Sequence, residues 1–250
     1  MIQKWDPKSY AKDAAFVSIY GEELITLLAP IPGDKVMDLG CGDGFLTEKM
    51  AEIGCVVTGV DASAAQVGAT KERGIKAVVG NGESLGLLDE FDGIISNAAL
   101  HWMRRPEKVI ANVWLNLKPG GVFVGEMGAK GNVSSVVETL SSLLERRGHD
   151  SKLHNPWYFP TEEEYSELLM AQGFNINTTS TFSRPTKIKG DLVSWLRIFA
   201  QSFVAPIEEK ERDFFYKEAE TALRPYLYSE KNGWIVDYVR LRFKVYRPTS

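Results

Sequence analysis

Short runs of β-branched residues alternate with helix-like segments between residues 35 and 126. Runs such as KVMDLG, VVTGVD and FDGIISNA are separated by longer segments with the apolar spacing of amphipathic helices. Strands and helices that alternate in this way form right-handed βαβ units, which build a mainly parallel sheet. We therefore expect an α/β fold with a doubly wound sheet in this part of the chain.

After about residue 130 the pattern changes to amphipathic helices, separated by loops rich in Asn, Pro and aromatic residues. The chain then ends in WIVDYVRLRFKVYRP, which alternates with the period of a half-buried strand. We expect a core of residues 1–130 with 231–250, and a mostly helical cap of residues 131–230. Arg240 and Arg242 in the last strand would lie in solvent at a sheet edge, or one of them would face an anionic ligand.

Composition argues against several classes of protein. A net charge of −4 argues against binding nucleic acid through a general basic surface, which needs clustered Lys and Arg. The two cysteines, Cys41 and Cys55, have no paired spacing, so neither a disulfide framework nor a Cys-based metal site is indicated. No stretch approaches the roughly 18 apolar residues of a membrane span. We expect a soluble cytoplasmic protein without nucleic-acid or membrane partners.

The loop after the first expected strand, VMDLGCGDGF, carries Gly40, Gly42 and Gly44 at alternate positions. In open parallel sheets ligands bind at the carboxyl ends of the strands, and glycines let a ligand approach the backbone there. A dinucleotide fingerprint would need a small residue in place of Phe45, and a Walker loop would need G-K-[ST] after the glycines. The alternative interpretation is a tight strand-to-helix turn that binds nothing.

A second acidic residue points to a nucleoside. Asp61 ends VVTGVD, 23 residues after Asp38, near the spacing at which a carboxylate accepts both hydroxyls of a ribose. Asp61 could instead cap the helix that starts near residue 64, although Ser63 alone can serve as that cap. Asp38 would repel a phosphate and attract an ammonium group. Together these residues favour a ligand with a ribose but no pyrophosphate.

These segments, together with GNGES, FDGIISNAALHW and LKPGGVFVGEM in the same order, resemble the class I S-adenosylmethionine-dependent methyltransferases over roughly residues 30–130. SNAALHW, the N-terminal WDPKSY and the aromatic-rich tail are similar, more loosely, to the trans-aconitate methyltransferase branch. The resemblance implies a Rossmann-like, seven-stranded sheet whose last strand, over 234–247, is antiparallel, with a lid inserted before it. It also implies S-adenosylmethionine as the cofactor, S-adenosylhomocysteine as its product and a small-molecule acceptor.

Carried over position by position, the resemblance places Asp38 and the three glycines around the methionine portion of the cofactor. It gives Asp61 the ribose, and it sets Ala62 and Asn81 against the adenine. Asn81 stands where many relatives have Asp, and its amide oxygen can still accept a hydrogen bond. Asn97 would border the transferred methyl group. The expected cofactor residues are thus Asp38, Gly40, Gly42, Gly44, Asp61, Ala62, Asn81, Gly82 and Asn97.

Methyl transfer from a sulfonium requires neither a metal nor a catalytic triad, because the leaving group is already activated. The enzyme can work by aligning nucleophile, methyl carbon and sulfur in a dry pocket. Aromatic faces suit the positive sulfonium, although each aromatic residue could instead belong to the core. The candidates for lining the pocket are Trp5, Tyr10, Trp102, Trp157 and Tyr158.

His101 follows the fourth expected strand and is the candidate catalytic base for an alcohol or a carbon acid. It could equally bond a nearby backbone group, and a carboxylate acceptor would need no base. We expect transfer to oxygen. The alternatives are transfer to carbon or nitrogen, another reaction of the cofactor on this scaffold, an NAD oxidoreductase, and a nucleoside-binding protein without turnover. The basic strand residues suggest an anionic acceptor, whereas NPWYF suggests an aromatic or apolar one.

Overall fold

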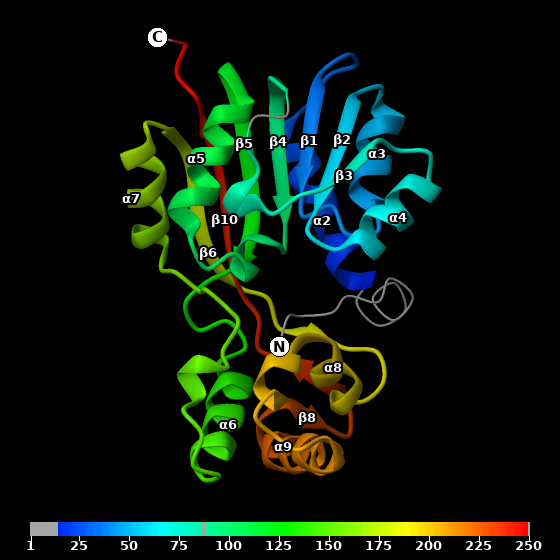
Figure 1. Cartoon of the computed structure of the whole chain (residues 1–250), viewed down its shortest axis with the longest axis vertical. Coiled ribbons are helices and arrows are strands. Elements are labelled where there is room, and N and C mark those ends of the chain that lie inside the picture. The colour runs from blue at the N-terminus through cyan, green and yellow to red at the C-terminus, as the bar shows by residue number, and fades with distance from the viewer. Residues whose placement is uncertain (1–14, 87–88, 250) are drawn as a thin grey trace.

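A seven-stranded sheet forms the centre of the computed structural model, which describes residues 15–86 and 89–249 (Figure 1). The strands are, in sheet order, β3 (Ala77–Val79), β2 (Val56–Asp61), β1 (Lys35–Leu39), β4 (Phe91–Asn97), β5 (Leu117–Gly128), β10 (Val239–Tyr246) and β6 (Asn175–Ser183). The first five pair in parallel, whereas β10 is antiparallel to both of its neighbours. This topology confirms the expected doubly wound α/β fold with a reversed last strand.

Helices cover both faces of this sheet. They are α2 (Ala15–Leu28), α3 (Phe45–Ile53), α4 (Ala64–Glu72), α5 (Pro106–Asn116) and α7 (Glu162–Gln172). Neighbouring residues of a strand pack on opposite faces: Val36 joins side chains of α2 and α3, and Met37 joins those of α5 and α7. Because both faces are covered, the strands are nearly continuous apolar runs in the sequence. No helix in the described ranges is long and apolar enough to cross a membrane.

A second unit lies beyond the end of the sheet at which β4 and β5 end (Figure 1). It consists of α6 (Ser134–Glu145), α8 (Leu192–Phe199), α9 (Arg212–Leu227) and a small sheet of β7 (Thr186–Lys187), β9 (Gly233–Val236) and β8 (Tyr228–Ser229). This unit has its own apolar core, which includes Leu140, Leu196, Phe203 and Phe215. Its position brings its side chains to the carboxyl ends of the parallel strands, where ligands of such sheets bind.

The expected cap of residues 131–230 is divided between the two units. Within it, α7 and β6 return to the main sheet, where β6 forms the edge strand beside β10. β6 has the sequence NINTTSTFS, and its residues are exposed or partly exposed. An edge strand this rich in Thr, Ser and Asn lacks the apolar pattern that marks the central strands. The segment before it, α7, is helical like the expected cap, so the sequence pattern did not separate these two elements from the cap.

The structure also differs from the sequence prediction at the end of the chain, where the single strand expected over 234–247 is divided into two strands. β9 belongs to the small sheet and β10 to the main sheet, and the strand structure is interrupted between them at Asp237 and Tyr238. The Asp237 carboxylate accepts hydrogen bonds from the backbone N–H and the hydroxyl of Ser135 (3.0 and 2.9 Å) and from the hydroxyl of Ser134 (3.1 Å). The chain turns where this carboxylate holds the first turn of α6.

Candidate active site

A cavity of about 740 Å³ lies where the carboxyl ends of the parallel strands meet the second unit. We call one part of its wall the glycine end; it is formed by Gly40, Gly42, Asp61, Ala62, Asn81 and Gly82. We call another part the aromatic end; it is formed by Trp157, Phe159, Trp195, Phe199, Tyr238 and Arg240. Asn97, His101 and Trp102, at and after the end of β4, line the same cavity.

The three glycines of the first loop have different surroundings. All three have positive φ, which favours glycine. A Cβ on Gly40 would lie 2.2 Å from Cβ of Ala99, and one on Gly44 would lie 2.9 Å from side-chain atoms of Thr70. A Cβ on Gly42 would meet nothing within 4 Å. Close packing therefore accounts for Gly44, which does not line the cavity, whereas Gly42 leaves open space at the cavity wall.

Asp61 lies at the end of β2 with both carboxylate oxygens on backbone donors. Gly42 N–H donates to Oδ2 (3.0 Å) and Ser63 N–H donates to Oδ1 (2.8 Å). Burial raises the pKa of Asp61, and these two hydrogen bonds oppose that rise. Ser63, not Asp61, caps α4 by accepting from Gln66 N–H. Each Asp61 oxygen keeps a second lone pair, so the carboxylate can still accept from two hydroxyls of a ligand.

Asp38, in contrast, lies beneath the loop and not in the cavity wall. Its side chain is 2% exposed, and Oδ2 accepts a hydrogen bond from the hydroxyl of Thr47 in α3 (2.7 Å). Burial raises the pKa of Asp38 to about 7, while the bond from Thr47 works in the other direction. The carboxyl group therefore joins β1 to α3 and would act on a ligand only through the loop above it.

The residues expected at the adenine lie together. Ala62 is exposed, and Asn81 and Gly82 follow β3 in the same wall. Asn81 Oδ1 accepts from Glu83 N–H (2.9 Å) and caps the short 3-10 helix Gly82–Ser84. The side chain of Asn97 lies toward α2, because a Cβ on Gly21 would come within 2.7 Å of its Nδ2.

His101 is held as a neutral imidazole. It is 6% exposed, and its Nδ1 accepts a hydrogen bond from Gly128 N–H (3.2 Å). Burial keeps the pKa of His101 well below its ordinary value, and the positive charge of Arg240 lowers it further. Since a backbone N–H can only donate, Nδ1 has no proton and the neutral ring carries its proton on Nε2. His101 is thus arranged to donate a hydrogen bond from Nε2, and this geometry argues against its acting as the general base.

Of the two basic residues weighed in the last strand, Arg240 reaches the cavity and Arg242 does not. Arg240 is 6% exposed, and its guanidinium carbon lies 4.5 Å from the centre of the Tyr238 ring. Tyr238 in turn accepts a hydrogen bond from Nε1 of Trp195 (2.9 Å). At the aromatic end, the buried cation of β10 therefore packs on the ring of Tyr238, which Trp195 of α8 holds in place.

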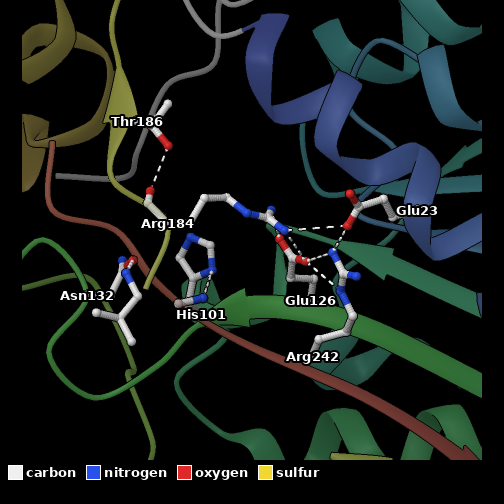
Figure 2. A network of polar contacts seen from close by, with 9 residues as sticks. Glu23, His101, Glu126, Asn132, Arg184, Thr186 and Arg242 are labelled. Atoms are coloured by element: carbon white, nitrogen blue, oxygen red, sulfur yellow. Dashed lines mark hydrogen bonds and ion pairs between the residues drawn. The ribbon is translucent and has the colours of Figure 1, made fainter. Parts of the chain in front are cut away.

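Arg242 belongs to an ion-pair network beside His101 (Figure 2). Glu126 of β5 pairs with Arg242 of β10 and with Arg184, which follows β6. Glu23 of α2 pairs with Arg242 at the outer side. The hydrogen bond from Arg242 is the main cause of a lowered pKa of Glu23, and burial, which acts in the opposite direction, has a smaller effect. Both arginines are thus already bound to carboxylates, and the network joins α2 to β5, to β10 and to the residue that follows β6.

Of the five aromatic residues expected to line the cavity, two do so, one does not, and two lie outside the described residues. Trp102 and Trp157 line the cavity, with ring centres 5.8 Å apart. Tyr158 does not line it; its N–H donates to the carbonyl of His101 (2.9 Å), and its side chain packs into the core shared with α5 and α7. In this extended loop alternate residues share a side, so Trp157 and Phe159 face the cavity. Trp5 and Tyr10 lie outside the described residues.

A comparison with protein-family models matches residues 37–125 to the family described as methyltransferase domain. A methyltransferase of Schizosaccharomyces pombe, itself uncharacterized, is 35% identical over 97% of this chain and 98% of its own length. The chain belongs to the class I S-adenosylmethionine-dependent methyltransferases. A second relative, the trans-aconitate 2-methyltransferase of Mycobacterium tuberculosis, is 27% identical to this methyltransferase, over 89% of this chain and 87% of that protein.

Solved structures of low sequence identity share the fold of the methyltransferase. A Bacillus halodurans protein described as a putative methyltransferase has a TM-score of 0.63 at 13% identity and covers 91% of this chain and 98% of its own. The [4+2]-cyclase SpnF has a TM-score of 0.60 at 16% identity and covers 93% and 82%.

Sequence reasoning missed part of the methyltransferase's cavity wall. Phe159 was within reach, because it follows Trp157 by two residues in the same extended loop. Ser63, Gln66, Asn132, Phe199 and Tyr238 also line the cavity. Those from the second unit carry no motif, and only the fold brings them to the strand ends. Within the described ranges, no group of three or more His, Cys, Asp or Glu side chains is arranged to hold a metal ion.

Proposed function

We propose that this methyltransferase transfers a methyl group from S-adenosylmethionine to an anionic oxygen, a carboxylate, of a small molecule. The observation that carries the proposal is that buried Arg240 and neutral His101 line the same cavity. Arg240 supplies a permanent positive charge, and His101 supplies an N–H donor. A cation and a donor in one cavity wall suit a carboxylate, whose two oxygens only accept.

The glycine end fits the cofactor. Gly42 leaves open space at the wall, and Asp61 keeps acceptor capacity for two ribose hydroxyls. Ala62, Asn81 and Gly82 would flank the adenine, and Gly40 and Asn97 would border the methionine portion and the methyl group. When bound, S-adenosylmethionine supplies a methyl carbon on a positively charged sulfur, a leaving group that needs no further activation. A cavity of about 740 Å³ also lies within the range of about 300–1,000 Å³ for ligand pockets.

A carboxylate acceptor agrees with the state of His101. An alcohol or a carbon acid would require a base, and Nδ1 of His101 is occupied by Gly128 N–H while Nε2 carries the ring proton. A carboxylate is already ionised at neutral pH. Arg240 would hold it in place, and the Nε2–H of His101 would fix its orientation. The relative from Mycobacterium tuberculosis is named for trans-aconitate, an organic anion, which supports a carboxylate acceptor without fixing the number of its carboxylates.

The proposal is tested with methyl-labelled S-adenosylmethionine and a panel of carboxylic acids. We expect label in a product that releases methanol in alkali, which identifies a methyl ester. Arg240→Gln should raise the acceptor KM about 10- to 100-fold, because a hydrogen bond to a charged group contributes about 1.5–3 kcal/mol. Arg240→Lys should recover part of that loss. The Kd for S-adenosylmethionine, measured by calorimetry, should change less than about twofold, since Arg240 is outside the glycine end.

Transfer of label to an amine or a carbon acid and to no carboxylate would refute the proposed acceptor. An unchanged acceptor KM in Arg240→Gln would remove Arg240 from acceptor binding.

A further inference from the structure

The aromatic end is apolar apart from a few polar groups. Trp157 and Phe159 are nearly stacked, with ring centres 5.7 Å apart and planes at 19°. The ring centres of Trp195 and Phe199 are 5.0 Å apart on one side of α8, and both side chains are buried. Nε1 of Trp195 is engaged with the hydroxyl of Tyr238, so the indole offers the cavity an apolar surface. Such a wall favours an apolar or aromatic ligand body.

Positive charge in this part of the wall is limited. Among the described residues that line the aromatic end, Arg240 is the cation. Arg104 also lines the cavity, but it is exposed and follows Trp102 and Met103 on the loop after β4. Arg184 and Arg242 are bound to Glu126 and are outside the wall. One guanidinium can pair with one carboxylate through two parallel hydrogen bonds.

A second carboxylate on the acceptor would therefore face aromatic rings. Removing an ionised carboxylate from water without a partner is strongly unfavourable. A tricarboxylate would bring two such groups into the aromatic end. A monocarboxylate would place its one charge on Arg240 and its apolar body against the rings.

We infer that the acceptor is a monocarboxylic acid with an extended apolar or aromatic body, and that polycarboxylates are discriminated against. The inference rests on the proposed function, since it names the class of carboxylate. A carboxylate oxygen forms the bond to the methyl carbon as the carbon–sulfur bond breaks. The electron pair of that bond stays on sulfur, so an anion and a sulfonium give a neutral ester and a neutral thioether. No proton is transferred, which agrees with a neutral His101 that donates from Nε2.

The change of charge also favours product release. The acid is paired with Arg240, whereas the neutral ester lacks the charge that held it. The ester should therefore bind more weakly than the acid from which it forms, and we expect it to be a poor inhibitor.

The experiment compares two series of acceptors on the full-length protein. The first is hexanoate, octanoate, decanoate and trans-cinnamate; the second is succinate, citrate and trans-aconitate. We expect kcat/KM to rise about fourfold per added methylene until the cavity is filled, from the free energy of burying a CH₂. Polycarboxylates should be at least about 100-fold poorer. Calorimetry with S-adenosylhomocysteine present should show binding of octanoate and none of citrate.

A matched pair of variants locates the effect. Phe199→Ser places a hydroxyl in the aromatic end and should lower kcat/KM for octanoate at least about tenfold, while leaving the Kd for S-adenosylmethionine unchanged. Phe214→Ser alters an exposed aromatic residue of α9 outside the cavity wall and should change neither value. The unchanged cofactor affinity shows that Phe199→Ser is folded.

The possible failures are distinguishable. Ester formation with trans-aconitate or citrate at rates equal to octanoate, or no dependence on chain length, would overturn this inference and leave the proposed function intact. Binding of octanoate without ester formation would overturn the proposed function and leave the binding class intact. Neither binding nor transfer with any carboxylate, with cofactor affinity retained, would overturn both.

Discussion

Glu126 is expected to be the most costly single charge to remove from the folded protein. Its side chain is 3% exposed, and its oxygens accept hydrogen bonds from both Arg184 and Arg242 (Figure 2). Glu126→Gln keeps the shape of the side chain and removes the charge. Two guanidiniums, 14% and 20% exposed, would then share Glu23, whose side chain is 60% exposed.

The size of the loss follows from this burial. Removing one partner of a buried ion pair costs about 3–5 kcal/mol, because the remaining charge stays buried without compensation. Arg184 and Arg242 keep some solvent contact and keep Glu23, so we expect about 3 kcal/mol for Glu126→Gln. Glu23→Gln is the matched control, since it removes the exposed partner of the same network. An exposed ion pair contributes about 0–1 kcal/mol.

Urea unfolding followed by circular dichroism measures both variants against the natural protein. The loss in Glu23→Gln should shrink in 0.5 M salt, because exposed charges are screened, while the loss in Glu126→Gln should persist. Equal losses in the two variants, or a loss under about 1 kcal/mol for Glu126→Gln, would show that burial of this network does not decide its contribution.

Two further predictions concern the glycine loop. The pKa of Asp38 is about 7 in the fold and near 4 when unfolded, so its stabilising contribution is complete below pH 4 and is lost as the pH rises from about 4 to about 7. The stability of Asp38→Asn relative to the natural protein should therefore increase with pH, by up to about 1.4 kcal/mol per pH unit in that window. The Tm of both proteins, measured from pH 5 to 8, checks this. A difference in Tm that stays constant with pH would contradict the raised pKa. Gly42→Ala and Gly44→Ala should each cost about 1–2 kcal/mol for the left-handed backbone. Gly42→Ala should weaken S-adenosylmethionine binding more than Gly44→Ala does, whereas Gly44→Ala should lose additional stability against Thr70; the reverse order in calorimetry and urea unfolding would contradict these roles.

The central sheet could be predicted because its strands are buried on both faces. Val36 and Met37 pack on opposite sides, so the strand appears as an apolar run between helical segments. β6 could not be predicted in the same way, because it is a polar edge strand whose place depends on pairing with β10. The break at Asp237 was also hidden, since its cause is a contact with Ser134 and Ser135, about a hundred positions earlier in the chain.

The glycine end of the site was predictable for a similar reason. Strand ends of a parallel sheet meet at one edge, so Gly42, Asp61 and Asn81 converge without knowledge of any side-chain contact. The sequence could not separate Asp38 from Asp61, since both lie at the carboxyl end of a strand. Only the structure shows that Thr47 holds Asp38 beneath the loop, while Asp61 turns to the cavity.

The register of β10 against β5 explains why Arg240 and Arg242, which share one side of the strand, have different surroundings. Arg240 and Arg242 are two residues apart in β10 and share one side of the strand. Directly opposite Arg242 in β5 stands Glu126, which binds it, and directly opposite Arg240 stands Gly128, which has no side chain. The same Gly128 donates its N–H to His101, and a Cβ there would lie 2.4 Å from the ring of Phe159. A single glycine thus leaves room for the ring of Phe159 and donates to the imidazole of His101. In our proposal, the anionic and aromatic indications in the sequence describe two parts of one acceptor site.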